Sequence, residues 1–210
     1  DGLDANSLDE DVARRAARLA LWELNHFPPW LPALLAAHRD IVIQEVIDEA
    51  IAELRDGAGR ERVLHKAFSG PTELRRTLGS EIERRVLDGS LPLSTRLEPA
   101  IELLLQSREL DRASWGPVVR DALAGADDDP ELWTLLWALQ FQVDSAAATA
   151  RVERLAGSAA AADRERVVAL ADVLWRWSDR TGIELDFDVH AVEALYIALV
   201  RVQDPNASDF

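Results

Sequence analysis

Apolar residues recur with the spacing of an α-helix along nearly the whole chain, and this pattern constrains the fold more than any other feature. One clear stripe consists of Val42, Val46, Ala50 and Leu54, with an apolar residue at every fourth position. Runs of alternating β-branched residues, which are typical of half-buried strands, are missing from the sequence. The pattern therefore predicts an all-α fold.

Proline and helix-capping residues divide the chain into separate helices. Pro28-Pro29 cannot continue a helix, and Asp129-Pro130-Glu131 combines a cap, a first-turn proline and an acidic residue. The helices expected from such signals cover residues 8–25, 30–37, 40–55, 99–109, 117–124, 130–143, 145–156, 159–178 and 189–202. The linkers between them are short, as is typical of antiparallel helices that pack in chain order.

The stripe in residues 42–54 recurs once. Thirty-two residues further along, the same spacing is found in Leu74, Leu78, Ile82 and Val86, and Asp88-Gly89 ends this stripe as Asp56-Gly57 ends the first. Pairing the helices in order gives about five hairpins, or roughly 42 residues per pair, which is the HEAT and armadillo range. We therefore expect antiparallel hairpins stacked as a short HEAT/armadillo-like α-solenoid, with a compact helical globule as the alternative.

The length of 210 residues allows one large domain or two small ones. We expect a single helical-repeat domain over residues 1–210, with sub-units at 1–93 and 94–210. Methionine is absent, so residue 1 is not an initiator, and we expect the chain to be a fragment of a larger protein.

Composition excludes several classes of partner and chemistry. The 38 acidic and 23 basic residues give a net charge of −15, which argues against a nucleic-acid partner or an anionic membrane. No apolar stretch approaches the roughly 20 residues of a membrane span, and no secretory signal is found, so we expect a cytoplasmic protein. The absence of cysteine excludes disulfides, thiolate metal sites and a cysteine nucleophile.

Sequence motifs for catalysis are missing as well. No Gly-x-Ser-x-Gly elbow, no P-loop and no pair of histidines at zinc-protease spacing occurs. We therefore expect no catalytic residue, no metal and no cofactor in this chain, and no enzyme activity. The alternative is a metal or small-ligand site at Asp186, Asp188 and His190, although one of these aspartates is more simply the cap of the following helix.

Two features suggest a surface for a protein partner. Between Arg55 and Arg85, eight basic and five acidic residues give a local charge of +3, so Arg75-Arg76 and Arg84-Arg85 are candidates for a docking surface. Solvated helix exteriors are the alternative interpretation of these arginines. Trp175 and Trp177 point to different sides of one helix, and we expect Trp177 to be the exposed one, available to a neighbouring domain.

Glu23 is a candidate buried polar residue. A helix that continues to residue 25 would place it among Val12, Ala16 and Leu19, on an apolar face. A buried carboxylate needs partners, so we expect it to accept backbone N–H groups or to pair with an arginine such as Arg39. The functional alternative is a perturbed acid in a helix-lined pocket of a small-ligand binder or an all-α enzyme.

Two stretches resemble a known family. The first is Glu23-Leu24-Asn25-His26-Phe27-Pro28-Pro29-Trp30-Leu31, followed by Ala36-Ala37-His38; the second covers residues 185–201. The first resembles a repeat in the helical C-terminal regions of large bacterial STAND-type (NACHT-like) ATPases, many of them linked to antiphage defence. The second is similar to a helix near the end of such arrays.

The resemblance implies a function without catalysis in this chain. In that family the ATPase chemistry lies in a separate P-loop domain, and the helical repeats are thought to sense a ligand or partner. We therefore expect a sensor or scaffold that contacts a protein partner or other domains of the same polypeptide. An oligomerisation or inter-domain packing module is the further alternative.

Overall fold

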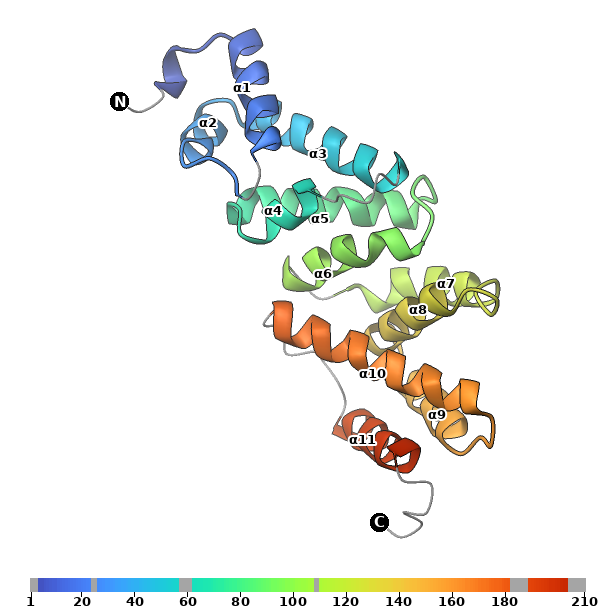
Figure 1. The fold of residues 1–210 in the computed structure, drawn as a ribbon. Coiled ribbons are helices and arrows are strands. Elements are labelled where there is room, and N and C mark those ends of the chain that lie inside the picture. Colours follow the sequence, from blue (N-terminus) through green and yellow to red (C-terminus); the bar gives the residue numbers. More distant parts are fainter. Residues whose placement is uncertain (1–3, 24–25, 57–61, 108–109, 182–188, 204–210) are drawn as a thin grey trace. The chain divides into compact units, whose positions relative to one another are not determined.

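The computed structural model describes residues 4–23, 26–56, 62–107, 110–181 and 189–203, and all regular secondary structure in these ranges is helical (Figure 1). The prediction of an all-α fold is confirmed. The elements are η1 (Ala5–Ser7), α1 (Glu10–Trp22), α2 (Leu31–Ala37), α3 (Arg39–Asp56), α4 (Arg62–Phe68), α5 (Thr72–Leu87), η2 (Thr95–Leu97), α6 (Glu98–Ser107), α7 (Arg112–Leu123), α8 (Pro130–Val143), α9 (Ser145–Ala156), α10 (Ala161–Thr181) and α11 (Val189–Gln203).

The chain forms two compact units. The first consists of Asp1–Pro92 and Arg96–Ser107, and the second of Leu93–Thr95 and Arg108–Phe210. The boundary therefore differs from the expected division at residue 93, because α6 packs against α4 and α5 and belongs to the first unit.

Local capping signals predicted several helix ends correctly. α8 and α9 have the expected bounds, because the side chains of Asp129 and Asp144 accept hydrogen bonds from the backbone of Leu132 (3.0 Å) and Ala147 (3.1 Å). Gly89, with φ of 76°, follows α5 in the left-handed region that favours glycine.

Other expected boundaries were wrong. α7 begins five residues before Pro117, which lies inside the helix. The side chain of Asp111 accepts a hydrogen bond from the backbone of Ser114 at 3.2 Å and so sets the start of α7. The short helix α4 was not expected at all, because its start is capped by Glu53 of another helix and not by a residue next to it in the sequence.

The first unit is built around α3, which contacts α1, α2, α4 and α5. The predicted stripe of α3 is buried, with Val42 and Ala50 fully inaccessible. The matching stripe of α5, from Leu74 to Val86, is buried as well. Both stripes therefore belong to the core of this unit, where burial of apolar surface stabilises the packing of the helices.

Two polar side chains attach α4 to its neighbours. Glu53 of α3 accepts hydrogen bonds from the backbone of Arg62 (3.1 Å) and Val63 (3.0 Å) and so caps the start of α4; burial raises the pKa of this carboxyl to about 6. Lys66, 2% exposed, donates from Nζ to the carbonyl oxygen of Leu21 at 2.5 Å. That carbonyl lies in the last turn of α1, where a cation is favourable, although burial lowers the pKa of Lys66.

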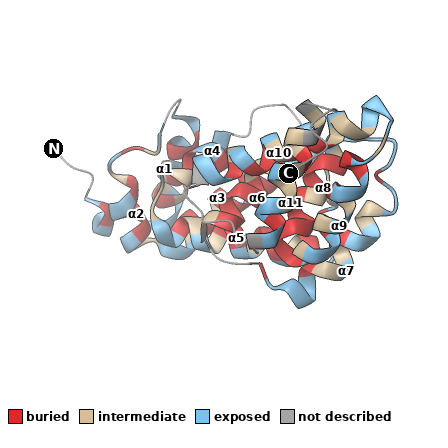
Figure 2. Ribbon diagram, turned by 90° about the horizontal axis from the view of Figure 1, so that it is seen from below, coloured by how far each residue is buried: buried red, intermediate tan, exposed pale blue. Residues whose placement is uncertain are grey.

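The second unit is built around α8, which contacts α7, α9 and α10 and is coloured as buried along most of its length in Figure 2. The predicted pairing of Trp133 and Trp137 is confirmed, with ring centroids 5.8 Å apart. Arg166 of α10 lies over the Trp133 ring at 4.9 Å, and Arg151 of α9 over the Trp137 ring at 5.9 Å. These cation–π contacts join both neighbouring helices to α8.

The expectation that Trp177 is exposed was wrong. Trp177 is 0% exposed, whereas Trp175 is 75% exposed. The buried face of α10 contains Leu170, Val173 and Leu174, and Trp177 follows them by seven, four and three positions, so it lies on the same face. Trp175 therefore lies on the opposite side of the helix.

This difference predicts unequal effects of two matched substitutions. Trp177→Ala should lower the free energy of unfolding by about 3–5 kcal/mol, because it leaves a cavity in the core. Trp175→Ala should lower it by less than about 0.5 kcal/mol, because the side chain is exposed. Urea denaturation followed by circular dichroism measures both values, and equal losses would show that the assignment of the two faces is incorrect.

Candidate protein-interaction surfaces

Large apolar side chains are exposed in only a few places in the described part of the chain. They are Leu19 and Trp22 on α1, Val168 and Trp175 on α10, and Val192 and Tyr196 on α11. All six therefore lie on the first long helix and on the last two. Large exposed apolar residues that gather on particular elements mark sites of interaction.

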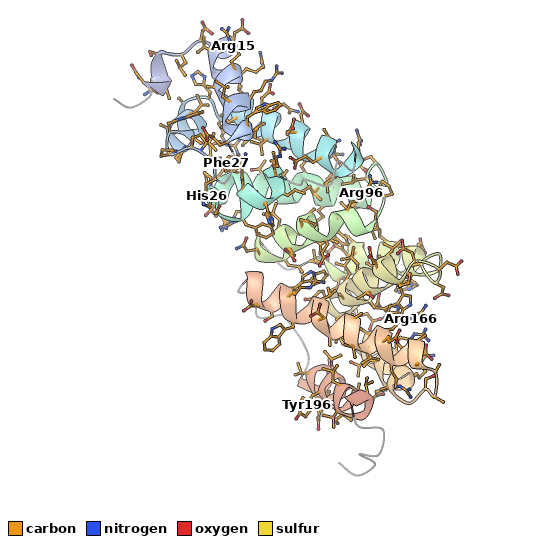
Figure 3. The ribbon with its side chains drawn as sticks, in the orientation of Figure 1. Arg15, His26, Phe27, Arg96, Arg166 and Tyr196 are labelled. Atoms are coloured by element: carbon orange, nitrogen blue, oxygen red, sulfur yellow. The ribbon has the colours of Figure 1, made fainter. Side chains whose placement is uncertain are left out.

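The first of these surfaces is the α1 surface, which consists of Arg15, Leu19 and Trp22. The three residues are spaced by four and three positions, so they share one face of the helix. The opposite face, with Ala13 and Ala17, is buried in the first unit, where α1 packs against α3. Leu19 is 65% and Trp22 73% exposed, and Arg15, labelled on α1 in Figure 3, is exposed as well.

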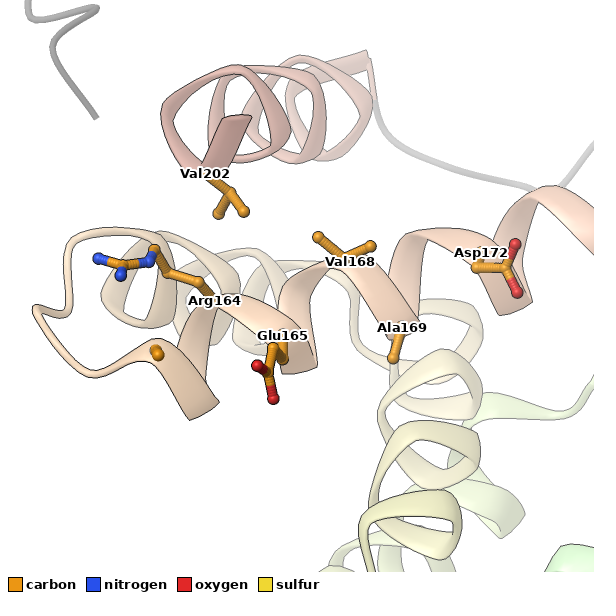
Figure 4. Close-up of a pocket in the computed structure, with 7 residues that line it drawn as sticks. Arg164, Glu165, Val168, Ala169, Asp172 and Val202 are labelled. Carbon is orange, nitrogen blue, oxygen red and sulfur yellow. The ribbon is translucent and has the colours of Figure 1, made fainter. Parts of the chain in front are cut away.

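The second is the α10–α11 surface, which consists of Val168, Trp175, Val192 and Tyr196. It includes an open groove of about 600 Å³ between the two helices, lined by Ala161, Arg164, Glu165, Val168, Ala169, Asp172 and Val202. Figure 4 shows Val168 and Val202 pointing toward one another across this groove. The floor is apolar and the rim is charged, an arrangement that is typical of sites that take up an amphipathic helix.

A third hollow, of about 460 Å³, lies at the motif that carries the family resemblance. It is lined by His26, Phe27, Pro28, Pro29, Pro32, Ser69, Gly70 and Pro71. A Cβ atom on Gly70 would lie 3.1 Å from the Phe27 ring, so glycine allows this close approach. Lys66 Nζ lies 5.9 Å from the centroid of the same ring (Figure 3 shows Phe27 beside α4). The motif thus forms an apolar shelf where the loops before α2 and α5 meet.

The expectation that Glu23 is buried was wrong. α1 ends at Trp22, and Glu23 follows it with a ψ of 142°, outside the helical range. Its side chain is exposed, because the chain has already left the helix that would have carried it along one face. The expected partner Arg39 instead forms ion pairs with Glu73 and Asp40.

The four candidate arginines have different surroundings. Arg84 and Arg85 each form an ion pair with Glu81 at 2.7 Å, and Arg84 also pairs with Asp88 at 2.7 Å. These hydrogen bonds from Arg84 and Arg85 lower the pKa of Glu81 to about 2. The positive charge of the pair is thus largely compensated locally.

The other two candidate arginines, Arg75 and Arg76, differ from each other in exposure and in partners. Arg75 is half-buried and donates to the backbone carbonyl of Phe68 at 2.9 Å. Arg76 is exposed and forms no ion pair with another described residue. A role of these arginines in docking stays a prediction, but they do not form one uncompensated basic patch.

The metal alternative falls largely outside the described residues. Asp186 and Asp188 belong to residues 182–188, which the structure does not describe. His190 is exposed, and its Nδ1 lies 4.0 Å from Glu193 Oε2. Within the described ranges, no group of three or more His, Cys, Asp or Glu side chains is arranged to hold a metal ion.

Comparisons with known proteins identify no relative. No protein-family model, no curated protein and no solved structure matches this chain. In the part that the structure describes, none of the helices combines the length and the apolar character needed to cross a bilayer.

The compensation of Arg84 and Arg85 can be tested by titration. We expect the carboxyl of Glu81 to titrate near pH 2 in ¹³C NMR, below the ordinary value of 4.5. Because this pKa is lowered by folding, the ion pairs stabilise the protein above about pH 4.5, and this contribution is lost as the pH falls toward 2. The double variant Arg84→Gln with Arg85→Gln should return the pKa toward 4.5. A parent pKa that already lies there would show that the ion pairs are absent in solution.

Proposed function

We propose that this chain is a non-enzymatic helical-repeat segment of a large bacterial NTPase of the STAND type, where it serves as a sensor or scaffold in the cytoplasm. Its role is to contact a protein partner or other domains of the same polypeptide. The observation that carries this proposal is the concentration of exposed large apolar residues on the α1 surface and the α10–α11 surface. Aromatic side chains such as Trp22, Trp175 and Tyr196 are enriched at protein–protein interfaces.

The helix lengths of the first unit support a repeat. α2 and α4 are both seven residues long, and each is followed by a longer helix, α3 or α5. The buried stripes of α3 and α5 are separated by 32 residues, and the two helices contact each other. Two successive units of a short and a long helix, each packed on the next, are the arrangement of helical-repeat proteins.

The link to NTPases depends on the resemblance of residues 23–31 and 185–201 to the family. Residues 26–29 line the hollow beside Gly70, so this part of the motif contributes to the surface of the first unit. Any hydrolysis would belong to a P-loop domain outside this chain, and a defence role would follow from the family alone.

A protein partner agrees with the charge of the chain. The net charge of −15 disfavours nucleic acid, whose binding requires basic surface, and Arg84 and Arg85 of α5 are ion-paired with Glu81. Apolar helix faces with a charged rim are instead suited to another protein.

Site-specific photocrosslinking tests the proposal. Benzoylphenylalanine introduced at Trp22 or Tyr196 of the full-length protein should form adducts in cells, because both side chains are exposed on the proposed contact surfaces. Mass spectrometry of the adducts should map them to defined segments of a protein partner or of another domain of the same polypeptide.

Arg120 provides the matched control, since it is an exposed residue on α7, a helix that carries none of the large exposed apolar side chains. Adducts should be at least about tenfold less abundant there, as for side chains outside an interface. Equal yields at all three positions, or none, would contradict the proposed role.

A further inference from the structure

The α1 surface and the α10–α11 surface complement each other in shape. α1 presents a single convex helix face, whereas the groove is lined mainly by α10, with Val202 of α11 on its other side. Val202, near the end of α11, lies across the groove from Val168 of α10. A groove between two helices that has an apolar floor takes up the apolar face of a third helix.

The spacing of residues on α1 fits this mode of binding. Arg15, Leu19 and Trp22 occupy positions i, i+4 and i+7, which are the positions through which an amphipathic helix contacts a groove. Leu19 and Trp22 are 65% and 73% exposed, whereas Leu21 of the same helix is 7% exposed and belongs to the buried face. α1 therefore has one apolar face buried in its own unit and a second that is not covered there.

The charges of the two surfaces complement each other as well. Arg15 donates to the backbone carbonyl of Asp11 at 3.3 Å but forms no ion pair with a described residue. On the rim of the groove, Glu165 is exposed and likewise has no ion pair among the described residues, and the exposed Asp172 pairs only with Arg176 of its own helix. Arg164 also lines the groove, so its rim carries charges of both signs. Arg15, beside the apolar face of α1, is matched by Glu165 on this rim, and such a pair sets the orientation of the bound helix.

We propose that the α10–α11 groove of one copy of this chain binds the α1 surface of a second copy. Leu19 and Trp22 enter the groove near Val168 and Trp175, and Arg15 lies against Glu165 and the rim of the groove. This inference rests on the proposed role in protein contacts and names the partner as the chain itself.

A contact between two different surfaces has a structural consequence. A dimer formed in this way still has one free α1 surface and one free groove. Association is therefore head-to-tail and continues beyond a dimer unless the copies close into a ring. The contact is therefore heterologous, in contrast to an isologous dimer in which one surface binds the same surface of its partner.

Two single substitutions each block one of the two contact surfaces. Leu19→Glu places a charge on the α1 surface, and Val168→Glu places one in the groove; both positions are exposed, so the fold should be retained, as circular dichroism can verify. In sedimentation equilibrium up to about 0.3 mM, where weak contacts are populated, the mass of the parent should rise with concentration. Each variant alone should remain monomeric, with association weakened at least about tenfold.

Mixing the two variants gives the decisive measurement. Leu19→Glu retains an intact groove, and Val168→Glu retains an intact α1 surface, so their mixture should form a 1:1 dimer and nothing larger. A charge exchange provides a second test: Arg15→Glu and Glu165→Arg should each weaken association, and the chain that carries both should regain it.

Several outcomes would overturn the proposal, each in a different way. A parent that is monomeric at every concentration excludes self-association; adducts at Trp22 and Tyr196 with another protein would still support the proposed function. If the Leu19→Glu variant still self-associates and the Val168→Glu variant does not, the contact is instead isologous and formed by the α10–α11 surface of both copies. Association of both variants at the parent level would exclude both surfaces.

Discussion

A helix can bury only as many of its faces as it has neighbours, and the distribution of apolar surface in this protein depends on that constraint. α3 and α8 each contact several helices, and most of their large apolar residues are buried. α1 packs mainly on α3 through small residues such as Ala13 and Ala17, and its outer face keeps Leu19 and Trp22 exposed. The candidate interaction surfaces thus lie on helices whose apolar residues exceed what their neighbours within the unit cover.

The sequence predicted helix ends well where one side chain determines them. Asp129 and Asp144 cap α8 and α9 through hydrogen bonds that span three residues, so their effect is visible in a short window. The ion pairs of Glu81 with Arg84 and Arg85 are also local, at spacings of three and four residues, and could have been found from the sequence. The start of α4 could not, because its cap comes from Glu53 in another helix.

The candidate site residues were predicted less well, for a geometrical reason. Periodicity gives the angle between two side chains on a helix but does not say which of them faces the core. The helical period correctly placed Trp175 and Trp177 on different sides of α10, but the residue predicted to be exposed was the buried one. Which side of α10 is buried depends on how α8 packs against it. Glu23 was misplaced since the helical period was continued past Trp22, where α1 ends. The apolar surplus of α1, with Leu19 and Trp22 opposite a row of alanines, was the signal that could have revealed its exposed face.

The sequence by itself determined that the protein is all-α, where most helices begin and end, and which apolar stripes recur at 32 residues, because these depend on interactions between residues close in the chain. Only the tertiary structure decided which helix faces are buried, that Lys66 reaches the carbonyl of Leu21, and that a groove opens between α10 and α11. Those features join residues far apart in sequence or on separate helices. Their positions follow from how the helices pack, which no local pattern specifies.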